Sequence, residues 1–146
     1  MKRILVALLF LSSTAFAQDR DRNTPPNNIR NSFDRDHASP QGAQWQKNNR
    51  NWHANFRDNN NRKVDAYYDN RGNRIATHRE IERTDIPRSV DMRVRDRFHT
   101  GDNYQVTRIE RPNAQPLFGI SLQLGSGSRT VYMDAQGRER QYHDPR

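Results

Sequence analysis

A short stretch of this sequence occurs twice, at a fixed spacing of 65 positions. Residues 66–72 read AYYDNRG and residues 131–137 read VYMDAQG, so the aspartate and the glycine of the two copies align. A repeat of this kind restricts the fold, because equivalent positions are expected to have equivalent local structure.

Each copy has the residues of a hairpin turn. The side chains of Asp69 and Asp134 can accept hydrogen bonds from the turn backbone, and the glycine three residues later can adopt a positive φ. Calcium binding by the first loop is less favoured, because an arginine lies within the loop and no glutamate closes it. After each turn the chain is expected to run on as a strand, over residues 74–81 and 138–142.

The same spacing relates two apolar pairs further upstream. Ile29 and Phe33, one helical turn apart, correspond to Val94 and Phe98. Between each pair and its turn, apolar and polar residues alternate as they do in half-buried strands. We therefore predict an α+β fold of two tandem units, each with one helix packed on antiparallel strands. The strands would form a continuous or abutting curved sheet with the helices on one side.

The first residues are typical of an export signal. Lys2 and Arg3 precede an apolar run that ends in an A-x-A cleavage motif at residues 15–17. The apolar run is shorter than the ~20 residues that a bilayer crossing requires, so the mature protein is expected to be periplasmic or secreted, without a transmembrane segment. The predicted divisions are a signal peptide at residues 1–17, a flexible leader at 18–28, a first unit at 29–83, a second unit at 84–143 and a tail at 144–146.

The charge of the chain indicates the partners that it can attract. Lysine and arginine number 25 against 17 acids, a formal net charge of +8 that becomes +6 without Lys2 and Arg3. Only three of these cations are lysine, and arginine can bind a carboxylate or a phosphate through two hydrogen bonds. Along residues 88–97, however, arginines alternate with aspartates, which is typical of a solvated helix face.

No pattern in the sequence indicates catalysis, a metal or a cofactor. The five histidines are scattered, and the absence of cysteine removes the usual partners of a zinc site as well as any disulfide. The glycine and serine run at residues 125–128 connects two expected strands, whereas a phosphate loop leads into a helix. No G-x-S-x-G motif is present. We predict a protein that is not an enzyme and has no cofactor.

The order of these elements resembles a known family. The stretches AQWQKNNRNWHANF at residues 43–56 and KVDAYYDNRGNRIAT at residues 63–77 follow the first apolar pair, and a shorter second copy follows them. This order is similar to that of the exported PepSY-like, or beta-lactamase-inhibitor-like, proteins of Gram-negative bacteria, over residues 29–143. The resemblance implies an α+β fold and the binding or inhibition of another protein, and it transfers no functional residue.

Four residues are the candidate binding residues: Tyr67, Tyr132, His53 and Arg57. Strand alternation places each of them opposite the inward side chains, and exposed aromatic residues and arginine are common anchors of binding sites. We therefore predict an exported binding module that recognises or inhibits a protein or a ligand through an exposed sheet face.

Two alternatives remain open for these residues. The four side chains could only solubilise an open sheet, or the basic protein could bind anionic lipid or polysaccharide in the cell envelope. Nucleic acid is not an expected partner, because export separates the protein from it.

Overall fold

The structure is a computed structural model that describes residues 23–48, 50–99, 103–124 and 127–145. The predicted signal peptide and the start of the leader lie outside these residues.

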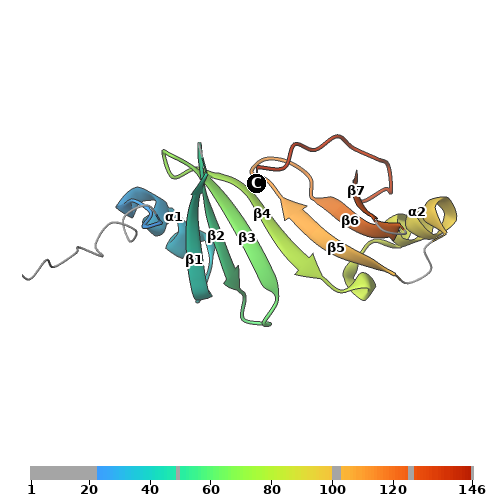
Figure 1. The fold of residues 1–146 in the computed structure, drawn as a ribbon, viewed down its shortest axis with the longest axis horizontal. Helices are drawn as coiled ribbons and strands as arrows, with labels where there is room; N and C mark the ends of the chain where they lie inside the picture. Colours follow the sequence, from blue (N-terminus) through green and yellow to red (C-terminus); the bar gives the residue numbers. More distant parts are fainter. Residues whose placement is uncertain (1–22, 49, 100–102, 125–126, 146) are drawn as a thin grey trace, which may run out of the picture.

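Seven strands form one antiparallel sheet in which each strand pairs with the next one in the sequence (Figure 1). The elements are α1 (Asn27–Asp36), β1 (Gln41–Asn48), β2 (Asn51–Arg57), β3 (Lys63–Asp69), β4 (Arg74–Ile81), the 3-10 helix η1 (Arg83–Asp85), α2 (Arg88–Phe98), β5 (Tyr104–Glu110), β6 (Leu117–Leu124) and β7 (Gly127–Met133).

The predicted fold class is wrong. The protein is mostly β, with a single seven-stranded sheet and only two α-helices in the described residues, and it does not divide into two tandem helix-on-sheet units. The ladder from Thr77↔Glu110 to Ile81↔Val106 joins β4 to β5, so strands that were assigned to different units are neighbours. The repeated turns could not predict this pairing, because turn chemistry fixes the register only within its own hairpin.

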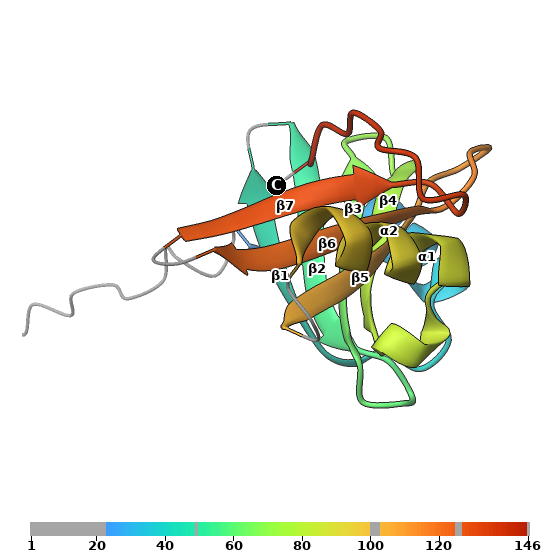
Figure 2. The same cartoon turned by 90° about the vertical axis from the view of Figure 1, so that its right-hand side faces the viewer.

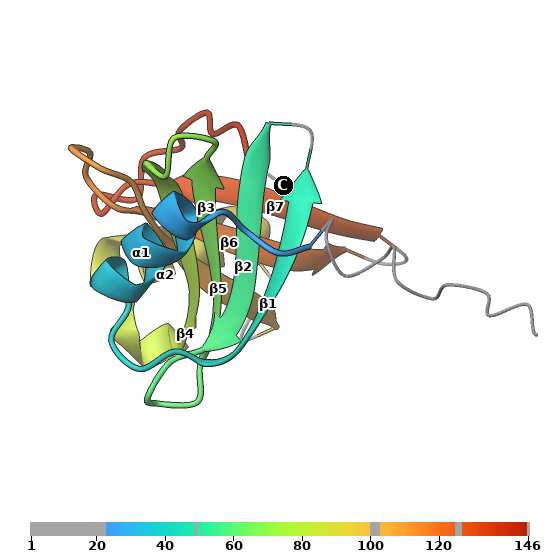
Figure 3. The same ribbon diagram turned by 90° about the vertical axis from the view of Figure 1, so that its left-hand side faces the viewer.

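Two hydrophobic clusters lie on one face of the sheet, at opposite ends of the molecule. Figure 2 shows α2 over β5 and β6, and Figure 3 shows α1 at the other end, beside β2 and β3. Strand alternation buries every second residue against the helix, with its neighbours on the opposite face. The cluster at α1 contains Ile29, Phe33, Trp52, Ala54, Phe56, Val64, Ala66 and Tyr68. The cluster at α2 contains Ile86, Val90, Val94, Tyr104, Val106, Phe118, Ile120, Leu122, Val131 and Met133.

Polar side chains separate the two clusters on the helix face. The register places Arg79 beside Val64 of β3 and beside Arg108 of β5. Arg108 in turn forms an ion pair of 3.0 Å with Glu110 on the same strand. The two apolar cores are therefore linked through the strand ladder and not through a continuous apolar layer.

The hairpin-turn prediction is confirmed. Asp69 accepts hydrogen bonds from the backbone N–H groups two and four residues later, at 2.8 and 2.9 Å, and Asp134 does the same at 3.0 and 3.1 Å. Gly72 and Gly137 have φ values of +88° and +75°. The strand expected after the first turn is β4, whereas the second turn is followed by a single bridge, Met133↔Glu139, and by irregular chain.

Candidate functional site

The face of the sheet opposite the helices, which we call the open face, carries a row of polar and aromatic side chains. Cross-strand pairing places His53 beside Tyr67 and Asp65 beside His78, and Tyr132 lies on the same face of β7. The residues on β2, β3 and β7 point away from the helices because their sequence neighbours are buried in the hydrophobic clusters. His78 lies on the same face because it pairs with Asp65.

A histidine and a carboxylate are paired on the open face. The ring of His53 contacts Asp65, with 2.7 Å between Nε2 and Oδ1, and the side-chain amide of Asn55 donates to the same oxygen at 2.8 Å. Burial raises the pKa of the Asp65 carboxyl, but the hydrogen bonds from His53 and Asn55 outweigh this effect and hold the pKa below its usual value. Asp65 therefore stays ionised at neutral pH and fixes the orientation of both partners.

Tyr67 lies on the predicted face, but the expectation that it is exposed is wrong. Its exposed fraction is 0%. The ring of His53 stacks on it at 4.7 Å between centroids with an angle of 7°, and the ring of His78 lies 4.9 Å away on the other side. Rings on both neighbouring strands cover Tyr67, so it packs beneath the surface of the open face and holds these rings in place.

The C-terminal segment also contributes to the open face. The hydroxyl of Tyr142 lies 2.7 Å from Nε2 of His78, and its ring makes an edge contact with Tyr132, with 5.0 Å between centroids. The guanidinium of Arg111 lies 5.7 Å from the centre of the Tyr142 ring. Asp144 and Asp65 both line a small cavity of about 90 Å³ beside His78. The chain end thus returns across the centre of the sheet.

The four predicted binding residues are only partly brought together. His53 and Tyr67 are in contact, whereas Tyr132 approaches them through Tyr142 and His78. Arg57 lies four residues beyond His53 on β2, is exposed, and donates from Nη1 to the backbone oxygen of Asn61 at 2.7 Å.

Sequence reasoning missed three residues of this face, Asp65, His78 and Tyr142. Asp65 lies between the inward residues Val64 and Ala66 of β3 and could have been found by the same rule as His53, whereas His78 lies between Thr77 and Arg79 and follows no such alternation. Tyr142 had no such signal, because the segment that carries it was expected to be a regular strand. Its position depends on the path of the chain after the single bridge between β7 and Glu139.

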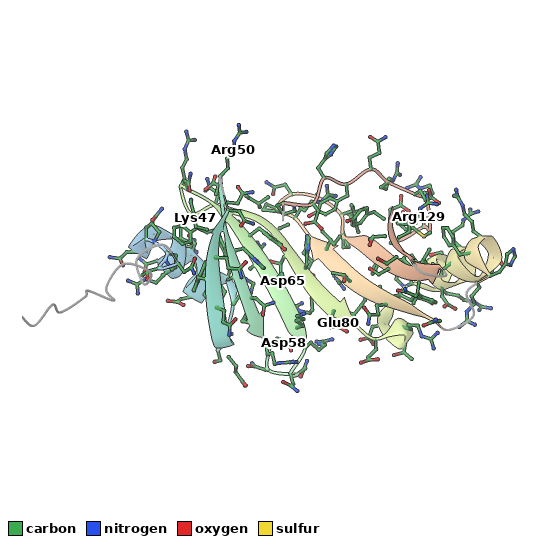
Figure 4. All side chains as sticks on the ribbon, viewed as in Figure 1. Lys47, Arg50, Asp58, Asp65, Glu80 and Arg129 are labelled. Atoms are coloured by element: carbon green, nitrogen blue, oxygen red, sulfur yellow. The ribbon has the colours of Figure 1, made fainter. Side chains whose placement is uncertain are left out.

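Acidic side chains occupy the middle of the sheet. In Figure 4, Asp65 and Glu80 lie over β3 and β4, while Lys47, Arg50 and Arg129 lie nearer the ends of the sheet.

Within the described residues, no three His, Asp or Glu side chains are arranged to hold a metal ion. No helix in the same part of the chain is long and apolar enough to cross a membrane.

Comparison with known proteins relates this fold to solved structures. No family model matches the sequence, and no curated protein does. A Bacteroides eggerthii protein with a provisional periplasmic assignment has a TM-score of 0.74 at 12% identity, over 81% of this chain and 87% of that one. A DUF2874 family protein from Bacteroides ovatus has a TM-score of 0.72 at 19% identity, over 82% and 86% of the two chains.

A third solved structure decides the fold. The BLIP-like protein from Bacteroides fragilis has a TM-score of 0.70 at 16% identity, over 84% of this chain and 87% of that one. The chain has a BLIP-like fold. The expected likeness to beta-lactamase-inhibitor-like proteins is confirmed at this level, whereas none of these three structures is described as PepSY-like. Identities this low show a shared fold and no shared activity.

Proposed function

We propose that this protein is an exported, non-catalytic binding module that recognises or inhibits another protein through the open face of its sheet. The observation that carries the proposal is the division of the sheet: both helices pack on one face, and the other face presents ordered polar and aromatic side chains. Tyrosine, histidine and arginine on a broad sheet suit protein recognition, because each combines apolar area with a hydrogen-bonding group.

The contacts within the open face favour binding because they fix the side chains in advance. Asp65 holds His53, and the His53 ring is stacked on Tyr67. Tyr142 is held by His78 and packs on Tyr132. Side chains that are already ordered lose less conformational freedom on association, so more of the contact energy contributes to affinity.

The predicted binding residues have different roles in this proposal. Arg57, Tyr132 and His53 are the side chains that contact the partner, because each keeps some exposed surface. Tyr67 is buried and acts by positioning His53. The notion that these residues merely solubilise the sheet accounts less well for their mutual contacts, which a solvated face does not require.

Export is part of the proposal. The apolar N-terminal run with its A-x-A motif supports cleavage before Gln18 and release into the periplasm or the medium. The provisional periplasmic assignment of the Bacteroides eggerthii structure agrees with this location. The two Asp and Gly turns match in their hydrogen bonds and φ values, so the sequence repeat is proposed for the turns alone.

The test combines capture with matched variants. Tagged protein comprising residues 18–146 is used to capture partners from a cell-envelope extract, and the captured protein is purified and titrated. The double variant Arg57→Ala with Tyr132→Ala should bind at least ~10-fold more weakly. Met92→Ala is the control, because Met92 is exposed on α2, behind the sheet. Equal affinities for the double variant and the unaltered protein would refute the use of the open face.

A second candidate is the binding of anionic lipid or polysaccharide. A groove of about 420 Å³ between the ends of β2 and β4 and the starts of β3 and β5 is lined by four cationic side chains and two acidic ones. The cations are Arg57, Arg62, Lys63 and Arg83, and the acids are Glu80 and Glu82. Retention on heparin or acidic liposomes that is lost at high salt, and lost in Arg57→Gln with Lys63→Gln, would favour this candidate.

A further inference from the structure

The two edge strands of the sheet are protected to different degrees. β1 contains a register shift between Gln41 and Gln44, and Gly42 within it has a φ of +62°. Bulges of this kind bend an edge away from incoming strands. β7, at the other edge, pairs with β6 without any register shift from Phe118↔Met133 to Leu124↔Gly127. β7 is therefore the regular edge of the sheet.

The backbone of β7 directs hydrogen-bonding groups away from the sheet. The carbonyl oxygen of Tyr132 accepts a hydrogen bond from the N–H of Arg140, at 2.8 Å, on the side opposite β6. Since the polar groups of alternate residues in an antiparallel strand point to the same side, the N–H and C=O groups of Ser128 and Thr130 also point outward. Both residues are exposed.

A groove lies beside this edge. Its volume is about 430 Å³, and its other wall is the C-terminal segment after the bridge at Glu139. The groove is lined by Arg129, Thr130, Val131, Tyr132, Arg140 and Tyr142, with Glu139, Gln141 and His143. The groove is therefore a space next to β7 in which a further strand could lie. The C-terminal segment pairs with β7 only at Met133, the last residue of that strand.

The charges around the groove favour an acidic occupant. Arg129 and Arg140 line it together with His143, and the one acid in the lining, Glu139, is already paired with Arg97. Arg140 also contacts Asp134 at 2.8 Å, so Arg129 is the cation that is most available to a ligand. Arg129 lies at the β7 end of the molecule in Figure 4. The rings of Tyr132 and Tyr142 supply apolar surface beside these charges.

We propose that β7 binds an extended acidic peptide segment of a partner protein by strand addition in this groove. Ser128 and Thr130 supply the backbone hydrogen bonds, and Arg129 selects for carboxylate side chains. Strand addition of this kind takes its affinity from the backbone and its specificity from the flanking side chains. The site lies at an edge of the sheet and shares Tyr132 with the open face, and it is tested separately from that face at Arg57, which does not line the groove.

The test uses the full mature chain and a defined probe, an N-acetylated six-residue peptide of alternating glutamate and valine. In isotope-labelled protein, the peptide should shift the amide signals of Ser128 and Thr130 and slow their hydrogen exchange. Thr130→Pro removes one outward N–H at an edge position that tolerates proline, and it should weaken binding about 10-fold. Thr130→Ala keeps the N–H and should bind as the unaltered protein does.

Three further measurements test the backbone bonds, the charge preference and the location of binding in turn. A backbone N-methylated acidic peptide and a peptide of alternating lysine and valine should each bind about 10-fold more weakly or not at all. Arg57→Ala, which affects the open face, should leave binding unchanged. Thermal unfolding verifies that Thr130→Pro is folded. The proposal would be overturned if the acidic peptide did not bind, or if Thr130→Pro bound it as tightly as the unaltered protein does. It would also be overturned if the N-methylated or the lysine peptide bound equally well, or if β7 paired with a second copy of the chain instead.

Discussion

His37 is a titratable side chain inside the aromatic cluster at α1. Its exposed fraction is 8%, and its ring lies 5.1 Å from that of Phe33 and 4.9 Å from that of Phe56. Its Nε2 atom has no hydrogen-bond partner within the described part of the chain. Burial lowers the pKa of His37 below 6.5, although the neighbouring Asp36 acts in the opposite direction.

Replacing His37 with phenylalanine should change how stability depends on pH. Because the pKa of His37 is lower in the folded protein than in the unfolded chain, the unfolded chain takes up the proton first as the pH falls below about 6.5. The unaltered protein should therefore lose stability between pH 7 and pH 5. His37→Phe should lose less, and should be about 1 kcal/mol more stable at pH 6, because a buried polar atom is removed.

Thermal melting at several pH values measures this effect. His143→Gln is the matched control substitution, since His143 lies outside the aromatic cluster, in the C-terminal segment. A His37→Phe protein with the same slope as the unaltered protein would show that His37 does not carry the pH dependence.

Three glycines with positive φ form a graded series. An added Cβ would meet nothing within 4 Å at Gly42, the backbone oxygen of Asn28 at 3.0 Å at Gly72, and the backbone oxygen of Ser89 at 2.6 Å at Gly137. Alanine at any of these positions has a backbone cost of about 1–2 kcal/mol. Gly137→Ala should cost about 3 kcal/mol or more, because the turn must also move away from α2.

Urea denaturation of the three alanine variants should therefore rank the loss of stability as Gly42, then Gly72, then Gly137. The φ values of the three glycines are +62°, +88° and +75°, so backbone strain alone gives no such order. Equal losses at Gly42 and Gly137 would mean that the second turn does not pack on α2.

At the scale of elements, a tyrosine and an aspartate connect each helix to the sheet. The hydroxyl of Tyr104 on β5 donates to Asp91 of α2, with 2.5 Å between Oη and Oδ1. The hydroxyl of Tyr68 on β3 donates to Asp36 of α1 at 3.2 Å. Burial and then the neighbouring Asp91 raise the pKa of Tyr104 to about 12. Each bond adds a directional contact to helices that otherwise pack through apolar side chains.

Removing the hydroxyl of Tyr104 should affect stability in a pH-dependent way. Tyr104→Phe should cost about 1 kcal/mol at neutral pH, and Tyr68→Phe should cost less because its bond is longer. The pKa of Tyr104 is higher in the folded protein, so its contribution is complete below pH 10 and is lost as the pH rises to about 12. In urea titrations at pH 8 to 11, Tyr104→Phe should lack part of the alkaline loss. The same loss in both proteins would contradict this assignment.

Some of these structural features could be predicted from the sequence and others could not. The turn at Asp69 could be predicted, because its hydrogen bonds join residues at most four positions apart. The strand at residues 74–81 could also be predicted, because it directly follows that turn. The burial of Tyr67 could not, because it depends on His53 and His78 from two other strands. Nor could the position of Tyr142, which lies 64 residues from His78 in the sequence.

At the scale of the whole molecule, one ladder joins two apolar clusters that do not touch through apolar side chains. Every strand pairs with the next, and the five residue pairs between β4 and β5 make the central connection. Loss of one cluster would expose the edge of the strand that borders it, with its unpaired backbone groups. The sheet is therefore expected to unfold as one cooperative unit of the size that usually shows two-state behaviour.

The tryptophans allow this expectation to be tested, because both of them belong to the α1 end. Trp52 is part of the α1 cluster and Trp45 packs against it, whereas Val90 is fully buried in the cluster at α2. Val90→Ala should remove about 2 kcal/mol of stability and lower the melting temperature by about 5–10 °C. In a cooperative sheet, tryptophan fluorescence should report the same lowered temperature as circular dichroism, although the substitution lies at the far end.

Met92→Ala is the matched control on the same helix, since Met92 is 51% exposed and its loss should change stability by no more than about 0.5 kcal/mol. If the fluorescence transition of Val90→Ala stayed at the temperature of the unaltered protein while circular dichroism split into two steps, the β4 and β5 ladder would not couple the two ends. Coincident transitions would mean that a partner bound at either end of the sheet stabilises the whole chain, because ligand binding to the folded state opposes every route of unfolding.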